Sequence, residues 1–220
     1  IDSASTSGNY GQPILVDSSL QTALSVNQDA QTPSLIASID GGAIAVWVQV
    51  VDGVQRVRSN IFEADGSAKG VQDLDLVLQG TNKVDSPRVV QSLNGDIAVT
   101  WRQVGLEIYD LWYTRLVAAN WLEPEKLEFD DRGGVDEIAM TYNVENTLVV
   151  AWSMSDADDA HELKLKSFHA SSGWSSLIDI PLSSPVSIDG LVDLSVIYDQ
   201  EGNGLLLWGQ NAFSRTVVSL

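Results

Sequence analysis

Acidic side chains gather at one point of the chain where they could bind a cation. The densest run is Asp156-Ala-Asp-Asp159. Hard cations such as calcium need several converging oxygen ligands. Asp156, Asp158 and Asp159 are therefore the candidate metal ligands, with calcium as the candidate cofactor. Because the chain has no Asp-x-Asp-x-Asp-Gly calcium loop, we favour a solvated acidic turn and expect no cofactor, with calcium binding as the alternative.

Other residues of catalytic type occur in patterns that strand structure also explains. Asp73 and Asp75 could act as a pair of glycosidase carboxylates, but the alternation Asp-Leu-Asp-Leu is equally typical of the solvated side of an outer strand. His161 and His169 would need further ligands to hold a metal. The chain has no Cys and no Gly-x-Ser-x-Gly nucleophile elbow. No complete catalytic constellation is predicted.

Aromatic residues provide the candidate ligand-binding positions, Trp112 and Tyr113. Both lie on a predicted outer strand, where an aromatic ring could stack on a sugar or anchor a protein partner. Trp121 and Trp174 lie on further outer strands, but we interpret them as structural first because they occupy repeated positions.

The charge of the chain excludes some partners. Thirty acidic and twelve basic residues give a formal net charge of −18. This charge repels nucleic acid phosphates and anionic membrane surfaces, so we expect no nucleic acid partner. No apolar run approaches the roughly 18–20 residues that span a bilayer. The polar N-terminus predicts either that a signal peptide has been removed or that none was present.

A short phrase occurs four times and indicates the fold. A turn built on Gly or Asn precedes an aliphatic run that ends in Trp, and the copies recur at intervals of about fifty residues. We expect these four tryptophans to pack between neighbouring repeats, whereas Trp112 has no aromatic counterpart in the other copies. The copies end at Trp47, Trp101, Trp152 and Trp208.

Each repeat divides into four short strands joined by turns, which predicts antiparallel meanders. The fourth repeat has only three strands before the chain stops, and Tyr10–Asp17 matches the fourth-strand phrase of the other copies. Pairing of this segment with Arg215–Leu220 would close a ring and remove two open sheet edges. We therefore predict one all-β domain over residues 1–220, with repeat strands at 33–78, 87–129, 135–182, and 192–220 plus 10–17.

The repeats resemble those of bacterial β-propellers related to the sialidase superfamily, the BNR-like propellers. The resemblance rests on the Trp-x-Gln element, present as Trp47-Val-Gln49, Trp101-Arg-Gln103 and Trp208-Gly-Gln210, and on Gly173-Trp174. Trp152-Ser-Met154 departs from the element. The resemblance covers roughly residues 10–220 and implies a β-propeller of four blades, each of four antiparallel strands.

The residues that sialidase catalysis would require are not matched. The superfamily's Asp-box, Ser-x-Asp-x-Gly-x-x-Trp, has its nearest counterpart at Ser38-Ile-Asp40-Gly-Gly, where Trp47 follows too late. We therefore predict a non-catalytic binding or interaction module, with a carbohydrate or another protein as ligand. The resemblance and the acidic composition favour an extracellular, periplasmic or cell-surface setting. The alternative is a glycoside hydrolase or lyase with carboxylates lining the channel of the propeller.

Overall fold

The computed structural model describes residues 30–75, 83–105, 108–129, 133–156, 161–182, 191–211 and 214–220. Within these ranges the regular secondary structure consists of β-strands, and all strand pairs are antiparallel. This confirms the all-β prediction. No helix of the described ranges could cross a membrane. The strand expected at Tyr10–Asp17 lies outside the described residues, and so does its pairing with the end of the chain.

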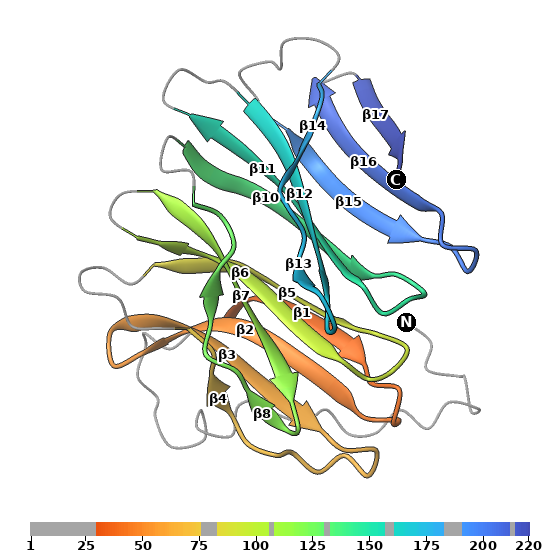
Figure 1. The fold of residues 1–220 in the computed structure, drawn as a ribbon. Helices are drawn as coiled ribbons and strands as arrows, with labels where there is room; N and C mark the ends of the chain where they lie inside the picture. Colours follow the sequence, from red (N-terminus) through yellow and green to blue (C-terminus); the bar gives the residue numbers. More distant parts are fainter. Residues whose placement is uncertain are drawn as a thin grey trace, which may run out of the picture.

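The strands form four sheets, each built from consecutive segments of the chain (Figure 1). The first sheet contains β1 (Ala30–Ala37), β2 (Ala43–Val51), β3 (Val54–Phe62) and β4 (Gln72–Asp73). The second contains β5 (Val84–Gln91), β6 (Ile97–Val104), β7 (Tyr109–Val117), β8 (Asn120–Trp121) and β9 (Glu125–Lys126). The third contains β10 (Gly133–Tyr142), β11 (Leu148–Asp156), β12 (His161–His169), β13 (Gly173–Trp174) and β14 (Ile178–Ile180). The fourth contains β15 (Val192–Tyr198), β16 (Gly204–Asn211) and β17 (Ser214–Ser219).

The repeated Gly or Asn has the same role in all four sheets. It closes the turn between the first and second strands with a left-handed backbone, a conformation that Gly adopts freely and Asn tolerates. In every copy its N–H donates to the carbonyl three residues earlier. The four turn residues are Gly41 (φ 89°), Gly95 (φ 90°), Asn146 (φ 58°) and Gly202 (φ 86°).

The outer strands are shorter than the sequence pattern predicts. The pattern predicts four strands in the repeat at 87–129, but its last part forms two short pieces, β8 and β9, which both pair with β7. Pro124 lies between these pieces and has no N–H to donate to a ladder. The outer strand of the third sheet is likewise divided into two short pieces, β13 and β14, which both pair with β12.

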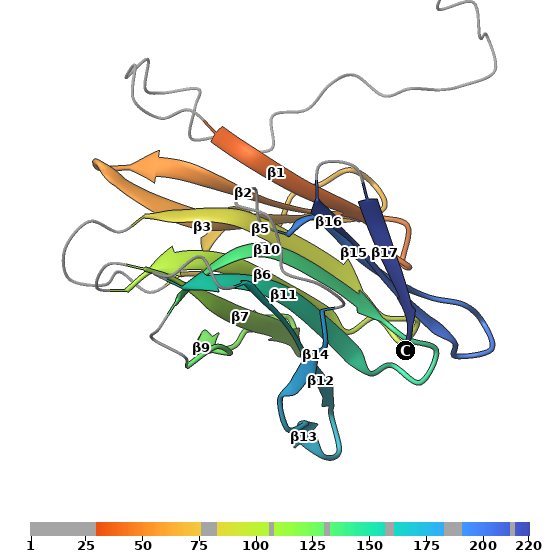
Figure 2. The same ribbon diagram turned by 90° about the horizontal axis from the view of Figure 1, so that it is seen from above.

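The sheets stack in chain order, with their first strands adjacent. β1 contacts β5, β5 contacts β10 and β10 contacts β15. Figures 1 and 2 show the resulting fan of sheets, with the first and fourth at its two ends. Trp101, Trp152 and Trp208 are at most 1% exposed and Trp47 is 3% exposed. The four repeat tryptophans are therefore buried as predicted, and packing between neighbouring repeats is confirmed for Trp101, Trp152 and Trp208. Trp47 packs with residues of its own sheet.

The packing between sheets is directional. In the second, third and fourth sheets, the face that carries the repeat Trp, here called the Trp face, packs on the opposite face of the preceding sheet. Trp101 shares a cluster with Ile44, Val46 and Val48 of the first sheet. Trp152 packs with Ala98 of the second sheet, and Trp208 packs with Val149 and Ala151 of the third. One type of interface therefore occurs three times.

Candidate ligand-binding cleft

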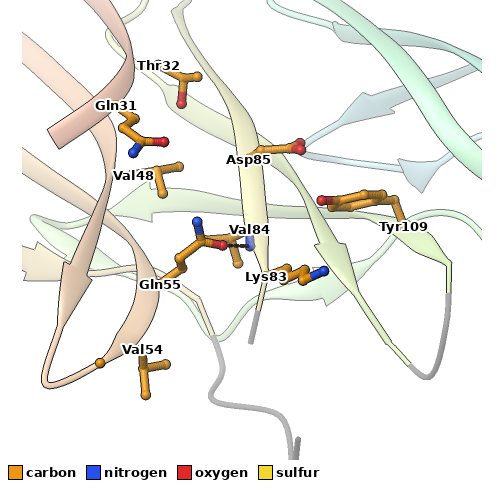
Figure 3. Close-up of a pocket in the computed structure, with 10 residues that line it drawn as sticks. Gln31, Thr32, Val48, Val54, Gln55, Lys83, Val84, Asp85 and Tyr109 are labelled. Carbon is orange, nitrogen blue, oxygen red and sulfur yellow. Dashed lines mark hydrogen bonds between the residues drawn. The ribbon is translucent and has the colours of Figure 1, made fainter. Parts of the chain in front are cut away.

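A cleft of about 540 Å³ opens between the first and second sheets. Figure 3 shows residues of β1 and β2 on one side, and Asp85 of β5 and Tyr109 of β7 on the other. The turn between β2 and β3 completes the lining. The lining residues are Gln31, Thr32, Val48, Gly53, Val54, Gln55, Lys83, Val84, Asp85 and Tyr109.

Two β-bulges flank the cleft. The ladder register shifts between Gln31 and Ser34 in β1, and between Asp85 and Arg88 in β5. The bulged residues Thr32 (φ 47°) and Ser86 (φ 50°) have left-handed backbones. Each precedes a proline, which a bulge accommodates because its N–H is not needed by the ladder. The same register shift occurs in β10 and β15, and Asp193 of β15 (φ 56°) also has a left-handed backbone. The bulge therefore belongs to the repeat and is not particular to the cleft.

Asp85 is held in place by Arg102, its partner across the strands. Arg102 Nε donates to Asp85 Oδ1 at 2.6 Å, and Nη2 donates to Oδ2 at 2.9 Å. Arg102 Nη1 also donates to the backbone carbonyls of Val135 and Asp136 in the third sheet, at 3.0 and 2.6 Å. A bidentate Arg–carboxylate pair fixes geometry as well as charge. The guanidinium therefore orients Asp85 and joins the second sheet to the third.

Tyr109 contacts the Asp85–Arg102 pair. Its ring lies against the guanidinium of Arg102, with Arg102 Cζ 4.7 Å from the ring centroid. Burial raises the pKa of the Tyr109 phenol, and the negative charge of Asp85 raises the pKa further. The phenol is therefore neutral at physiological pH and offers a hydroxyl to the cleft.

The chemistry of the lining is polar and mixed. The lining combines polar residues with valines. The polar groups are two amides (Gln31 and Gln55), a hydroxyl (Thr32), an ammonium (Lys83), a carboxylate (Asp85) and the phenol of Tyr109. Gln55 Oε1 accepts from the backbone N–H of Val84 at 3.3 Å, which joins the two sheets at the base of the cleft. Such groups bind hydroxyl-rich ligands, because each hydroxyl can donate and accept.

Trp112 and Tyr113, the candidate ligand-binding aromatics, lie on opposite faces of β7. Trp112 is half-buried and packs in the cluster of Trp101, between the first and second sheets. Tyr113 is 2% exposed and faces the third sheet, where its ring meets Trp174 edge-on at 4.9 Å. The two side chains therefore form no common aromatic surface, and the cleft lining includes neither of them.

The candidate metal ligands are described only in part. Asp156 is the last residue of β11, paired with Gly133, while Asp158 and Asp159 lie outside the described residues. Within the described ranges, no three His, Cys, Asp or Glu side chains gather as a metal site would require. His161 and His169 are the first and last residues of β12, at opposite ends of the strand.

The paired carboxylates Asp73 and Asp75 are bound by two arginines of β3. Arg58 Nε donates to Asp73 Oδ1 at 3.0 Å, and Arg56 Nε donates to Asp75 Oδ1 at 3.1 Å. Asp75 Oδ1 also accepts from the backbone N–H of Val57 at 2.8 Å. These bonds connect the end of the first sheet to its third strand, which favours a structural role for both carboxylates.

The residues of the cleft were not predicted as a site. The available signals were the Thr32-Pro33 and Ser86-Pro87 pairs at equivalent places, and a charged Arg102 inside the Trp-x-Gln element. These signals indicate an irregularity in two first strands. They do not indicate that the two irregular strands enclose a cleft together with Tyr109.

The all-β fold is propeller-like and is similar to the folds of several carbohydrate-active enzymes. A Hadza microbial sialidase superposes with a TM-score of 0.63 at 15% identity, over 87% of this chain and 44% of the sialidase. A Trypanosoma rangeli sialidase in complex with sialic acid superposes with a TM-score of 0.60 at 14% identity, over 89% of this chain and 36% of that protein. An endo-arabinase from Bacteroides thetaiotaomicron superposes with a TM-score of 0.51 at 13% identity, over 87% and 74%.

These similarities are to the fold. No family model matches the chain, and no curated protein matches it in sequence. The chain spans less than half the length of either sialidase. The expected relationship to sialidase-type propellers is confirmed at the level of architecture.

Proposed function

We propose that this protein is a non-catalytic carbohydrate-binding module and that the cleft between its first and second sheets holds the sugar. The observation that carries the proposal is the lining of this cleft. Residues with six polar side chains of five chemical types line it, contributed by both sheets. The fold shared with a sialidase and an arabinase supports a glycan, rather than another protein, as the ligand.

The organisation of Asp85 supports binding rather than hydrolysis. Most glycoside hydrolases use two carboxylates that flank the scissile bond. Among the described lining residues Asp85 is the single carboxylate, and both of its oxygens are bonded to Arg102. A carboxylate held in this way is a fixed hydrogen-bond acceptor. A setting outside the cytoplasm, as the resemblance implies, belongs to the same proposal.

A glycan array with the full chain tests the proposal, followed by calorimetric titration of the best ligand. Gln31→Ala and Tyr109→Phe each remove one hydrogen-bonding group from the cleft and should weaken binding about 3- to 10-fold. Gln200→Ala is the matched control, because Gln200 lines a separate cleft with Tyr142 and Tyr198. If both cleft variants retained the affinity of the parent, the ligand would have to bind elsewhere on the protein.

A second assay separates binding from catalysis. The array ligands are incubated with the protein, and the release of reducing ends or of unsaturated products is followed over hours. We expect no release above the buffer rate. Turnover that Asp85→Asn abolishes would establish the hydrolase or lyase alternative in place of the binding module.

A further inference from the structure

A second cleft, of about 330 Å³, lies between the second and third sheets. Residues 127–129 at the end of the second sheet contribute to its lining, and so do Lys164 and Lys166 of β12 and Leu177, which precedes β14. The cleft shares no lining residue with the one between the first and second sheets. Because the second sheet also packs on the first, and the third also packs against the fourth, the cleft lies in the interior of the stack of sheets.

The equivalent position in the preceding interface is filled by an aromatic ring. The repeat Trp pairs across the strands with Trp112 in the second sheet and with Lys164 in the third. Trp112 packs in the apolar cluster between the first and second sheets. Two residues further along these strands, Thr114 in β7 corresponds to Lys166 in β12. Two ammonium groups therefore replace an indole and a hydroxyl where the cleft opens.

Lysines are concentrated at this cleft, although the chain is strongly acidic. The chain has five lysines and a formal net charge of −18. Two of the five line the cleft. A third, Lys126, has its Nζ 5.8 Å from the ring centroid of Phe129, which is also a lining residue. Positive charge is thus gathered around an open space.

Two of these three ammonium groups have carboxylate partners. Lys164 Nζ bonds to Glu162 Oε2 at 2.8 Å and to Asp179 Oδ1 at 3.0 Å. Lys126 Nζ bonds to Asp110 Oδ1 at 2.9 Å. An entering anion would compete with these carboxylates, so neither lysine is a suitable anchor for it.

Lys166 differs from the other two lysines. Its Nζ donates to the backbone carbonyl of Leu127 at 3.2 Å and lies 5.8 Å from the ring centroid of Phe129. Among the described residues it has no carboxylate partner. Since an ammonium has three N–H donors, Lys166 retains donors for an external acceptor. Glu128 also lines the cleft, but it is 2% exposed, which shields its carboxylate from an entering ligand.

The accessible wall beside Lys166 is apolar. Phe129 is 71% exposed and Leu177 is 43% exposed, whereas Leu127 and Trp152 are buried beneath them in the same lining. An exposed aromatic ring offers a surface on which a second ring can stack. The cleft therefore combines one available positive charge with an apolar surface.

We propose that this cleft is a second binding site, for an aromatic carboxylate. Its carboxylate accepts from Lys166 Nζ in a charge-assisted hydrogen bond, and its ring lies against Phe129 and Leu177. The volume is at the lower end of small-molecule pockets, which run from about 300 to 1,000 Å³, and suits a ligand of one or two rings. The site is separate from the proposed sugar cleft and differs from it in chemistry, so neither proposal depends on the other.

Titration with sodium benzoate tests the proposal, followed by ¹H–¹⁵N spectra of the labelled full-length chain. The indole N–H signal of Trp152, identified by its loss in Trp152→Phe, should shift with a dissociation constant of about 1 mM, as a fragment-sized ligand would give. Lys166→Met keeps the aliphatic stem and removes the charge, so it should weaken binding at least about fivefold. Lys166→Arg should retain binding, and Lys69→Met is the matched control because Lys69 is an exposed lysine outside the cleft.

Three further ligands separate the two parts of the recognition. Benzamide, which has the ring without the charge, should bind at least about fivefold more weakly than benzoate. Sulfate and glucuronate, which have the charge without an aromatic ring, should also bind more weakly. Benzoate that shifts no signal of the cleft, or that binds Lys166→Met as it binds the parent, would overturn the proposal. Glucuronate or sulfate that binds as tightly as benzoate would overturn the assignment to an aromatic carboxylate.

Discussion

The indole Nε1 of Trp101 donates a hydrogen bond of 3.0 Å to Oε1 of Gln103, and Trp47 makes the same bond to Gln49 at 3.1 Å. Residues two apart in a strand share a face, so the Gln amide lies beside the buried indole that it satisfies. The Trp-x-Gln element is therefore a device for burying a tryptophan. The third repeat has Met154 in place of Gln, and Nε1 of Trp152 is buried without a hydrogen-bond partner among the described residues.

Restoring the element in the third repeat should stabilise the protein. Met154→Gln supplies an acceptor for Trp152, and a buried donor left unsatisfied costs about 1–3 kcal/mol. Because the new amide must itself be buried, we expect a net gain of about 1 kcal/mol in the free energy of unfolding, measured by urea denaturation. Met154→Leu, which adds no acceptor, should give no gain. A loss in both variants would show that the site requires the shape of Met.

The two kinds of tryptophan should differ in their contribution to stability. Trp101→Ala removes a fully buried ring and should cost about 3–5 kcal/mol. Trp112→Ala removes a half-buried ring from the same cluster and should cost clearly less. Urea denaturation of both variants checks the difference. Equal losses would mean that Trp112 is as much a core residue as Trp101.

The Asp85–Arg102 pair should be coupled in a double-mutant cycle. Arg102→Met leaves Asp85 and two backbone carbonyls without their donor and should cost about 2–3 kcal/mol. Asp85→Asn and the double variant complete the cycle, with an expected coupling energy above about 1 kcal/mol. Lys69→Met is the control, because its ion pair with Glu63 is solvent-exposed and should contribute little to stability.

Stability should fall in alkaline solution because of the buried tyrosines. Burial, followed by the charge of Asp96, raises the pKa of Tyr142 above the ordinary value of 10.0. Above pH 10 the unfolded chain loses this proton while the folded chain retains it, so stability that is fully present below pH 10 is lost as the pH rises. Urea denaturation between pH 8 and 11 measures the slope. Tyr142→Phe should make the slope shallower, and an unchanged slope would contradict the assignment.

Calcium should stabilise the protein if Asp156, Asp158 and Asp159 bind it. A bound metal raises the melting temperature by mass action. We expect a higher melting temperature in 5 mM calcium than in chelator, and no difference after Asp158→Asn and Asp159→Asn are combined. Identical transitions in both buffers for the parent would leave this segment as a solvated acidic turn.

The sequence was informative where the structure is repetitive. The four turns and the four buried tryptophans follow from local patterns, since a left-handed turn residue and an aliphatic run ending in Trp are visible without tertiary information. The breaks in the outer strands were not predicted, although Pro124 marks one of them. The cleft was harder still to predict from the sequence. Gln31, Asp85 and Tyr109 share no spacing pattern and are brought near one another only by the packing of two sheets.

The directional packing of the sheets has a consequence for how such chains change in length. The second and third repeats each carry both halves of the same junction, so a gene duplication that copies one of them would add a sheet whose two faces already fit its neighbours. Loss of one repeat would likewise join two compatible faces. Recombination between repeats could therefore lengthen or shorten this architecture, and the copies already differ at positions such as Met154 and Arg102.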